Sequence, residues 1–295
     1  GFTSRGAVGK DVVKLLDEAL RRKGLICLRI VALVNDTVGT LVAKSYSDRH
    51  CDIGVVLGTG TNACYVEKVA NISTWEANSS MDTMIVNMEW GNFDRLRRNN
   101  YDNRLDIESQ NPGCQFLEKM VSGMYLGEIA RDVINDLVRR DFLFKGVHLR
   151  NIFGRKGSFE TSDMSIIASD DSPDLRKVED FLVTRGIGKS TIFDRHRLQK
   201  VCKYVSSRAA RVSAAAIASV ITWMDPDLVK CHTVGIDGSL FEKYPGFDKA
   251  MQEVFADLFD ENAKKIRLET AKDGSGKGAA IIAAVATSLK ANVIC

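Results

Sequence analysis

Hydrophobic residues near the start of the chain recur at steps of three and four, which predicts an amphipathic helix over residues 10–23. Gly24 follows this stretch and is typical of a helix end. The aliphatic run 28–34 then predicts a strand that is buried on both faces. Two more strands are predicted at 52–57 and 63–67, joined by a short glycine-containing turn that is typical of a hairpin.

The rest of the chain alternates between the two patterns. A further strand is predicted at 84–90, and later segments predict helices at 116–137, 196–224, 247–259 and 276–289, with strands at 233–236 and near Ile266. Asp225 and Pro226 are expected to end the longest helix, since proline cannot continue one. Strands that come first as a meander and later alternate with helices predict an α/β fold, with a mixed sheet flanked by helices.

Composition and charge narrow the class of protein. The chain has 295 residues, 45% of them hydrophobic and 27% charged, which is typical of a globular protein that buries a core. Its 41 basic and 38 acidic residues give a net charge of +3, which argues against a dedicated nucleic-acid surface. No apolar run reaches the roughly 18 residues expected of a membrane span.

The cysteines and histidines of the chain lack the short paired spacings of disulfide frameworks and zinc sites. The sequence therefore favours reduced thiols in an intracellular protein, with no metal site built by the chain itself. The chain begins with Gly1 and Phe2 and without a methionine, so we expect it to be a piece of a longer protein.

Three short polar segments carry candidate chemistry. Asn35 and Asp36 follow the predicted strand 28–34, and ligands of open α/β sheets gather where strands end. The alternative is that Asp36 caps the next helix and Asn35 belongs to the turn. The turn 58–62 and the segment 237–239 combine glycine with a hydroxyl side chain and suit an anion, although a tight turn also requires glycine.

The segment 274–278 is similar to a phosphate-binding loop but departs from that motif at two positions. The motif needs a glycine where this chain has Ala271, and a serine or threonine where it has Gly278. We therefore expect this segment to be a glycine-rich start of the last helix.

Taken together, eight segments resemble the eukaryotic hexokinases and glucokinases, of the actin-like sugar-kinase superfamily. The resemblance covers essentially the whole chain, in the family's order and spacing. The segments are LVNDTVGT (33–40), GTGTNACYVE (58–67), NMEWGNF (87–93), NPG with FLEKMVSGMYLGEIAR (111–131), GSFETSDMS (157–165), SSRAAR (206–211), VGIDGSLFEKYP (234–245) and DGSGKGAA (273–280).

This resemblance implies an actin-like ATPase (ribonuclease H-like) fold of two lobes and the reaction of a hexokinase. The γ-phosphoryl group of ATP would pass to the 6-hydroxyl of glucose or a related hexose, as in the first step of glycolysis. By position, Asp36 matches the general base, which takes the proton of the attacking hydroxyl. The side chains that match the sugar contacts are Asn35, Asp36, Asn62, Glu89 and Glu118. Without the resemblance, Glu118 would be a solvated helix residue and Asn62 a turn residue.

The resemblance also implies where the nucleotide binds. The matching residues are Gly58, Thr59, Gly60, Gly123, Met124, Thr161, Ser165, Gly238 and Ser239. ATP is expected to bring Mg²⁺ with it, held mostly by phosphates and water, so no metal ligand is assigned to the chain. We expect a cytoplasmic protein that binds hexose and Mg-ATP, without nucleic acid or a membrane span. Docking on an organelle such as the mitochondrial outer surface, through residues upstream of Gly1, stays open.

Parts of the family pattern do not occur in this chain. An earlier glycine-rich phosphate turn, and the serine, threonine and lysine side chains that close on the sugar, would lie upstream of Gly1. We therefore expect residues 1–35 to be the end of the small domain, 36–272 the large domain, and 273–295 a helix that returns to the small domain. With an incomplete small lobe, the chain alone is expected to be inactive or barely active.

Two other functions stay open at this stage. A catalytically silent hexokinase-like sugar sensor would keep the sugar contacts but would not need Asp36. An actin-like or chaperone-like ATPase would share the nucleotide turns but would have no reason to bring Asn62, Glu89 and Glu118 together.

Overall fold

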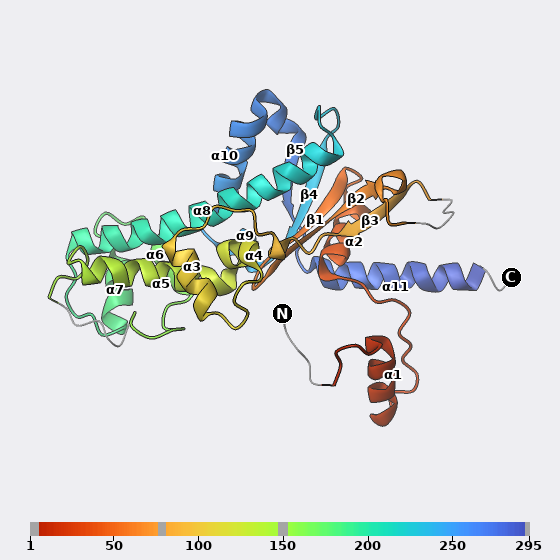
Figure 1. Cartoon of the computed structure of the whole chain (residues 1–295), viewed down its shortest axis with the longest axis horizontal. Coiled ribbons are helices and arrows are strands. Elements are labelled where there is room, and N and C mark those ends of the chain that lie inside the picture. The colour runs from red at the N-terminus through yellow and green to blue at the C-terminus, as the bar shows by residue number, and fades with distance from the viewer. Residues whose placement is uncertain (1–5, 76–80, 147–152, 293–295) are drawn as a thin grey trace.

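The computed structural model describes residues 6–75, 81–146 and 153–292, and these contain one five-stranded mixed sheet in the order β3-β2-β1-β4-β5 (Figure 1). β1 (Cys51–Leu57), β2 (Thr61–Lys68) and β3 (Thr83–Asn87) form an antiparallel meander. β4 (His232–Asp237) runs parallel to β1, and β5 (Ile266–Thr270) runs parallel to β4. The predicted mixed sheet, with a meander first and helix-linked strands later, is confirmed.

Helices cover both faces of the sheet. α2 (Asp36–Ser47) contacts β1 on one face and carries α11 (Gly274–Asn292) on its outer side. The other face is covered by the helices that lie around α8 (Ile192–Met224) (Figure 1). The remaining helical segments are α1 (Val12–Arg22), α3 (Asn100–Glu108), α4 (Phe116–Val121), α5 (Gly123–Arg139), α6 (Thr161–Ala168), α7 (Arg176–Thr184), α9 (Ser239–Lys243) and α10 (Phe247–Phe259), with short 3₁₀ turns η1 (Val69–Asn71), η2 (Trp90–Asn92) and η3 (Asp260–Lys265).

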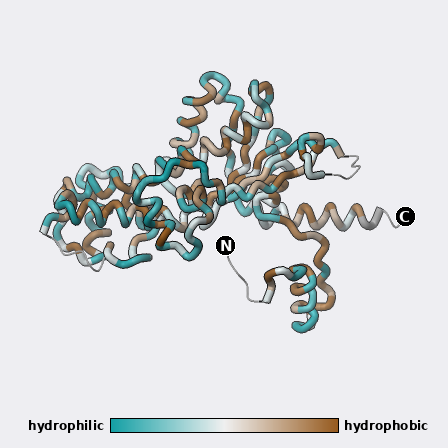
Figure 2. Tube along the Cα trace, in the orientation of Figure 1, coloured by the Kyte–Doolittle hydropathy of each residue, from teal (hydrophilic) through white to brown (hydrophobic). Residues whose placement is uncertain are grey.

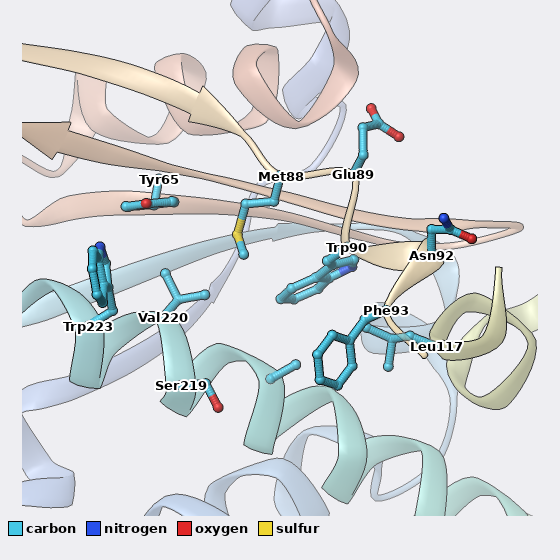
Figure 3. A pocket seen from close by; sticks show the side chains of 11 residues that line it. Tyr65, Met88, Glu89, Trp90, Asn92, Phe93, Leu117, Ser219, Val220 and Trp223 are labelled. Atoms are coloured by element: carbon cyan, nitrogen blue, oxygen red, sulfur yellow. The ribbon is translucent and has the colours of Figure 1, made fainter. Parts of the chain in front are cut away.

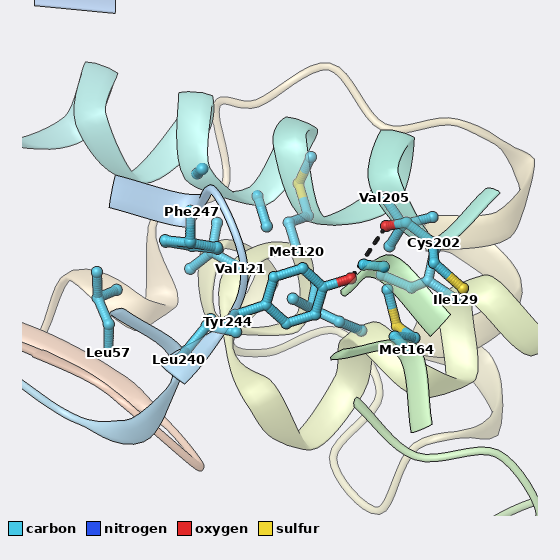
Figure 4. Close-up of a cluster of buried hydrophobic side chains, with 14 of the residues drawn as sticks. Leu57, Met120, Val121, Ile129, Met164, Cys202, Val205, Leu240, Tyr244 and Phe247 are labelled. Carbon is cyan, nitrogen blue, oxygen red and sulfur yellow. Dashed lines mark hydrogen bonds between the residues drawn. The ribbon is translucent and has the colours of Figure 1, made fainter. Parts of the chain in front are cut away.

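The main hydrophobic core lies between the sheet and the helices around α8. Ile53, Val55 and Leu57 of β1 are fully buried in it, which is expected of a central strand covered on both faces. Figure 4 shows part of this core around Tyr244, whose hydroxyl donates to the carbonyl of Cys202 at 3.3 Å. Burial raises the pKa of the Tyr244 hydroxyl, so it stays protonated and keeps this bond.

The predicted strand at 28–34 is wrong. These residues form no strand, and the side chains of Leu28 and Leu33 are 53% and 72% exposed. A strand needs a neighbour that accepts and donates its backbone hydrogen bonds, and no described strand lies beside this segment. Its apolar positions run along the link between α1 and α2, outside the main body (Figure 2).

Two further boundaries differ from the prediction for local reasons. The helix expected over 116–137 is divided at Ser122, whose backbone is extended, into α4 and α5. At this break the N–H of Gly123 donates across to the carbonyl of Gly58 at 2.8 Å, instead of to its own helix. The strand expected over 84–90 ends at Asn87, because Glu89 adopts a left-handed conformation (φ 53°) that a strand cannot contain.

The last helix begins at Gly274, which confirms that the segment 274–278 starts a helix. Its glycines let α11 approach α2 closely. A Cβ atom on Gly278 would lie 1.9 Å from the carbonyl oxygen of Gly39, so a side chain there would push the helices apart. No helix in the described part of the chain is long and apolar enough to cross a membrane.

A buried histidine links the end of α8 to the sheet. The Nδ1 atom of His232 lies 2.7 Å from a carboxylate oxygen of Asp52, and Nε2 lies 3.3 Å from Asp225, which follows α8. These two carboxylates raise the pKa of His232, Asp52 more strongly, although burial opposes them. The pKa of Asp225 is lowered, chiefly by the N–H of Lys230.

Replacing His232 with Gln should lower the free energy of unfolding at pH 6 by roughly 1.5–3 kcal/mol, the range for a hydrogen bond to a charged group. The folded pKa lies above the ordinary value of 6.5, so the stabilisation is complete below that value and is lost as pH rises through the folded pKa. The difference between the two proteins should therefore shrink as the pH rises above 6.5. Urea unfolding measures it, with the exposed His196→Gln as control. A difference that does not change with pH would contradict the prediction.

Candidate functional site

Strand alternation places two asparagine side chains on the same face of the sheet, toward α2. Asn62 is the second residue of β2 and shares its face with Cys64, which packs against Leu41 of α2. Asn87 ends β3 directly opposite Cys64 in the antiparallel register. Both amides therefore reach the sheet edge where α2 begins.

A hydrogen-bonded chain connects these amides with Glu89. The Nδ2 atom of Asn62 donates to Oδ1 of Asn87 at 2.8 Å and to Oε1 of Glu89 at 3.1 Å. The Nδ2 atom of Asn87 donates to the same Glu89 oxygen at 2.8 Å. The hydroxyl of Thr37 extends the chain to α2, since it lies 3.4 Å from Oδ1 of Asn87 and 2.7 Å from Oδ1 of Asn35.

Asn35 and Asp36 lie at the start of α2. The side chain of Asn35 caps the helix by accepting from the N–H of Thr37 at 3.0 Å, and Asp36 is the first helical residue. The capping alternative for Asp36 is therefore wrong, and so is the expectation that the pair follows a strand. The Asp36 side chain is exposed, accepts from the same N–H at 2.8 Å, and lies where the helix dipole favours a negative charge.

Glu118 approaches the same edge from α4. Its carboxylate accepts from the N–H of Thr61 at 3.1 Å, one residue before Asn62. A Cβ atom on Gly60 would lie 2.7 Å from this carboxylate, so a side chain there would displace the end of Glu118. Glu118 is half-buried against the hairpin, so its reading as a solvated helix residue is wrong.

A separate apolar cavity of about 550 Å³ lies on the other face of the segment that carries Glu89. In Figure 3 Met88 and Trp90 point into this cavity, whereas the Glu89 carboxylate points away from it. The Trp90 indole N–H donates to the hydroxyl of Thr61 at 3.0 Å, so the cavity wall supports the start of β2. Of the predicted sugar residues, Glu89 borders this cavity with its carboxylate turned away, and Asn35, Asp36, Asn62 and Glu118 are not part of its lining.

The hairpin loop between β1 and β2 also contacts the start of α5. The N–H groups of Gly123 and Met124 donate to the carbonyls of Gly58 and Thr59, at 2.8 and 3.3 Å. On the other side of the loop Gly238 has φ 128°, and a Cβ atom there would lie 2.2 Å from the carbonyl oxygen of Leu57. Only glycine allows three backbone segments to meet this closely.

The remaining predicted nucleotide residues surround one cavity of about 300 Å³ beside this loop. Gly123, Thr161, Ser165 and Ser239 all line it. The Thr161 hydroxyl donates to the carbonyl of Gly123 at 2.7 Å and accepts from the N–H of Gly127 at 3.0 Å, so it fixes the start of α5. Ser239 is the first residue of α9.

All the sequence-predicted site residues thus fall into two neighbouring groups joined by the hairpin loop 58–60. Thr37 and Asn87 connect Asn35 with Asn62 and Glu89, and neither was predicted from the sequence. Strand alternation was the signal for Asn87, because it lies two residues before Glu89 on the same face as Asn62. Within the described ranges, no group of three histidine, cysteine or acidic side chains is arranged to hold a metal ion.

Comparison with known proteins gives consistent matches along the chain. Two family models, both described as hexokinase, match residues 52–285 and 1–46. Hexokinase-2 of Equus caballus is 40% identical over 299 residues, covering 98% of this chain and 32% of the relative. Hexokinase-1 of Homo sapiens is 39% identical with the same coverage, so the chain spans about a third of these relatives.

A solved structure supports the same assignment. The hexokinase from Schistosoma mansoni complexed with glucose matches with a TM-score of 0.86 and 33% sequence identity, over 96% of this chain and 64% of that chain. The fold predicted from the resemblance, actin-like with a mixed sheet flanked by helices, is confirmed by this match. Because one hexokinase model alone covers residues 52–285, the chain belongs to the hexokinase family.

Proposed function

We propose that this chain is the larger part of an ATP-dependent hexokinase, which transfers the γ-phosphoryl group of ATP to the 6-hydroxyl of glucose or a related hexose in the cytoplasm. The observation that carries the proposal is the position of the hairpin loop 58–60. One side of it meets Glu118 and Asn62, and the other meets Gly123 and Gly238. A sugar and a nucleotide bound to these two groups would lie next to each other.

The side chains proposed to contact the sugar have the chemistry that a hexose requires. Hexose hydroxyls donate and accept hydrogen bonds in pairs, and the carboxylates and amides of Glu89, Glu118, Asn35 and Asn62 offer both kinds of partner. A sugar that lacks a hydroxyl leaves a polar side chain of the site without its hydrogen-bond partner. The site therefore discriminates strongly against such a sugar. The similar hexokinase from Schistosoma mansoni is complexed with glucose, which supports a hexose as substrate here.

Asp36 is proposed as the general base. It is exposed at the first turn of α2, beside Asn35, and a carboxylate there can accept the proton of a hydroxyl. The attacking oxygen becomes a better nucleophile as the proton leaves, and the phosphoryl group then passes to it. Positioning and charge stabilisation supply the rest of the rate, as in other phosphoryl transfers.

The residues proposed to bind the nucleotide suit ATP. Glycine at Gly58, Gly123 and Gly238 lets three backbone segments meet beside the hairpin loop, and hydroxyl-bearing residues line the neighbouring cavity, where they can donate hydrogen bonds to a nucleotide. We propose that Mg²⁺ binds together with the nucleotide, held mostly by phosphates and water, and neutralises part of the phosphate charge.

We also propose a division of the chain into residues 1–35 and 273–295, which contribute to a small domain, and 36–272, which form the large domain. Support comes from the N-terminal part, where α1 has no buried residue and Leu28 and Leu33 are exposed. A full-length protein, meaning a form that includes residues upstream of Gly1, would complete the small domain over this apolar surface. Docking on an organelle would depend on those residues as well.

The test is product formation by the full-length protein. With glucose and ATP it should release ADP and form hexose 6-phosphate in equal amounts, and omission of glucose should abolish ADP release. Sugar binding without turnover would overturn the kinase proposal in favour of a silent sugar sensor. ATP hydrolysis that does not depend on hexose would overturn it in favour of an ATPase.

A further inference from the structure

Asn87 contacts both Asn62 and Glu89 and yet is not itself among the proposed sugar contacts. The pairing of β2 with β3 places the Asn87 amide between Asn62 and Glu89. Cys64 lies opposite Asn87, and Asn62 lies two residues before Cys64 on the same face of the sheet. One amide group therefore lies between two side chains that are proposed to recognise the sugar.

The chemistry of these contacts fixes the direction of each amide. The oxygen of Asn87 accepts from Asn62, and its nitrogen donates to Glu89, both at 2.8 Å. If the Asn87 amide were turned over, two nitrogens would face each other and an oxygen would face a carboxylate, so both contacts would become repulsive. The oxygen of Asn62 is held as well, because it accepts from the N–H of Ala63 at 2.8 Å.

Glu89 needs neighbouring side chains that restrict the position of its carboxylate. Its backbone is left-handed, with φ 53° and ψ 42°, a conformation that residues other than glycine adopt at a cost and keep only when their surroundings hold them. The Glu89 side chain is exposed, so contacts from Asn87 and Asn62 are what restrict its carboxylate.

We propose that Asn87 is a positioning residue, which sets the spacing and orientation of Asn62 and Glu89 for the hydroxyls of the sugar. This inference rests on the proposed function. Asn87 does not contact Asp36 in the structure, so its loss should weaken sugar binding more than it slows the chemical step.

The experiment compares Asn87→Ala and Asn87→Asp in the full-length protein. Asn87→Ala should raise KM for glucose about 5- to 30-fold, the effect of losing one or two hydrogen bonds, with kcat changed by less than about 3-fold. Asn87→Asp keeps the shape and the acceptor for Asn62 but places a second carboxylate against Glu89, so its KM should rise further than that of Asn87→Ala.

Asn71 provides matched controls, because its Nδ2 also donates to a glutamate, Oε1 of Glu67, at 2.8 Å but outside the site. Asn71→Ala and Asn71→Asp should leave KM for glucose unchanged. An unchanged KM in Asn87→Ala, or an Asn87→Asp variant no worse than Asn87→Ala, would overturn the proposal. Equal effects of the Asn71 and Asn87 variants would show a general structural effect and would overturn it too.

A second measurement separates this inference from the proposed function. The side-chain amide signals of Asn62 in nuclear magnetic resonance spectra should shift in Asn87→Ala, because Nδ2 of Asn62 loses one of its two acceptors, and should not change in Asn71→Ala. If the unaltered protein fails to phosphorylate glucose, the proposed function fails. Unshifted Asn62 amide signals in Asn87→Ala would instead overturn the positioning role, whatever the activity.

Discussion

Glucose phosphorylation by the 295-residue chain alone should be slower than ~1 s⁻¹, the lower end of typical kcat values. Hexose kinases have to exclude water from the reacting phosphoryl group, which two lobes do by closing over the substrates. In this chain the N-terminal part buries little: α1 has no buried residue, and the apolar link to α2 is exposed. The proposed base and sugar contacts would therefore remain open to solvent.

The measurement is glucose-dependent ADP release by the purified chain, compared with the full-length protein under the same conditions. Circular dichroism and a cooperative urea transition serve as the control that the chain is folded, so that low activity is not a result of unfolding. A kcat of ~1–10³ s⁻¹ for the folded chain would contradict the prediction and would show that the large domain suffices.

The sequence predicted the sheet well where neighbouring elements were also present in the chain. The β1–β2 hairpin, β4 and β5 all form near their predicted positions, because each has a partner strand within the described residues. The run 28–34 has an equally apolar pattern but no such partner there, and it forms no strand. A hydrophobic pattern reports that a segment can be buried in a sheet, and it does not report whether a neighbouring strand is available.

The division of the helix at Ser122 had no signal in the apolar pattern. The positions on either side continue the same helical spacing, and the break depends on a contact with Gly58, 65 residues earlier in the chain. Tertiary contacts of this kind override local propensity. The same break turns the N–H groups of α5 toward the hairpin loop, so the deviation from the pattern lies in the candidate site.

The candidate site was predicted residue by residue from the resemblance and could not have been derived from spacing alone. Asn35, Asn62, Glu89 and Glu118 come from four different elements, and only the fold brings them to one edge. The structure brings them together, while their roles remain proposals. Thr37 and Asn87 were missed because neither is among the residues that the resemblance matches to sugar or nucleotide contacts.

Substitution of Asp36, the proposed general base, has the second large expected effect on activity. Asp36→Ala in the full-length protein should lower kcat by roughly 10²–10⁴-fold, the usual contribution of a general base, and change the affinity for glucose much less. The helix should survive the change, because Asn35 and not Asp36 caps α2. Asp36→Asn should be similarly impaired, since an amide keeps the shape and the hydrogen bonds but cannot accept the proton.

Asp248→Ala is the matched control for this variant. Asp248 is also an exposed carboxylate in the first turn of a helix, α10, so its loss removes the same favourable interaction with a helix dipole. Its kcat should stay within about 2-fold of the unaltered protein, as expected of a surface substitution away from the site.

Steady-state kinetics with saturating ATP, together with sugar binding measured by calorimetry, separate the chemical step from binding. If Asp36→Ala retains most of its turnover, another group accepts the proton. If glucose binding falls while kcat at saturating glucose is retained, Asp36 acts as a sugar contact and not as the base.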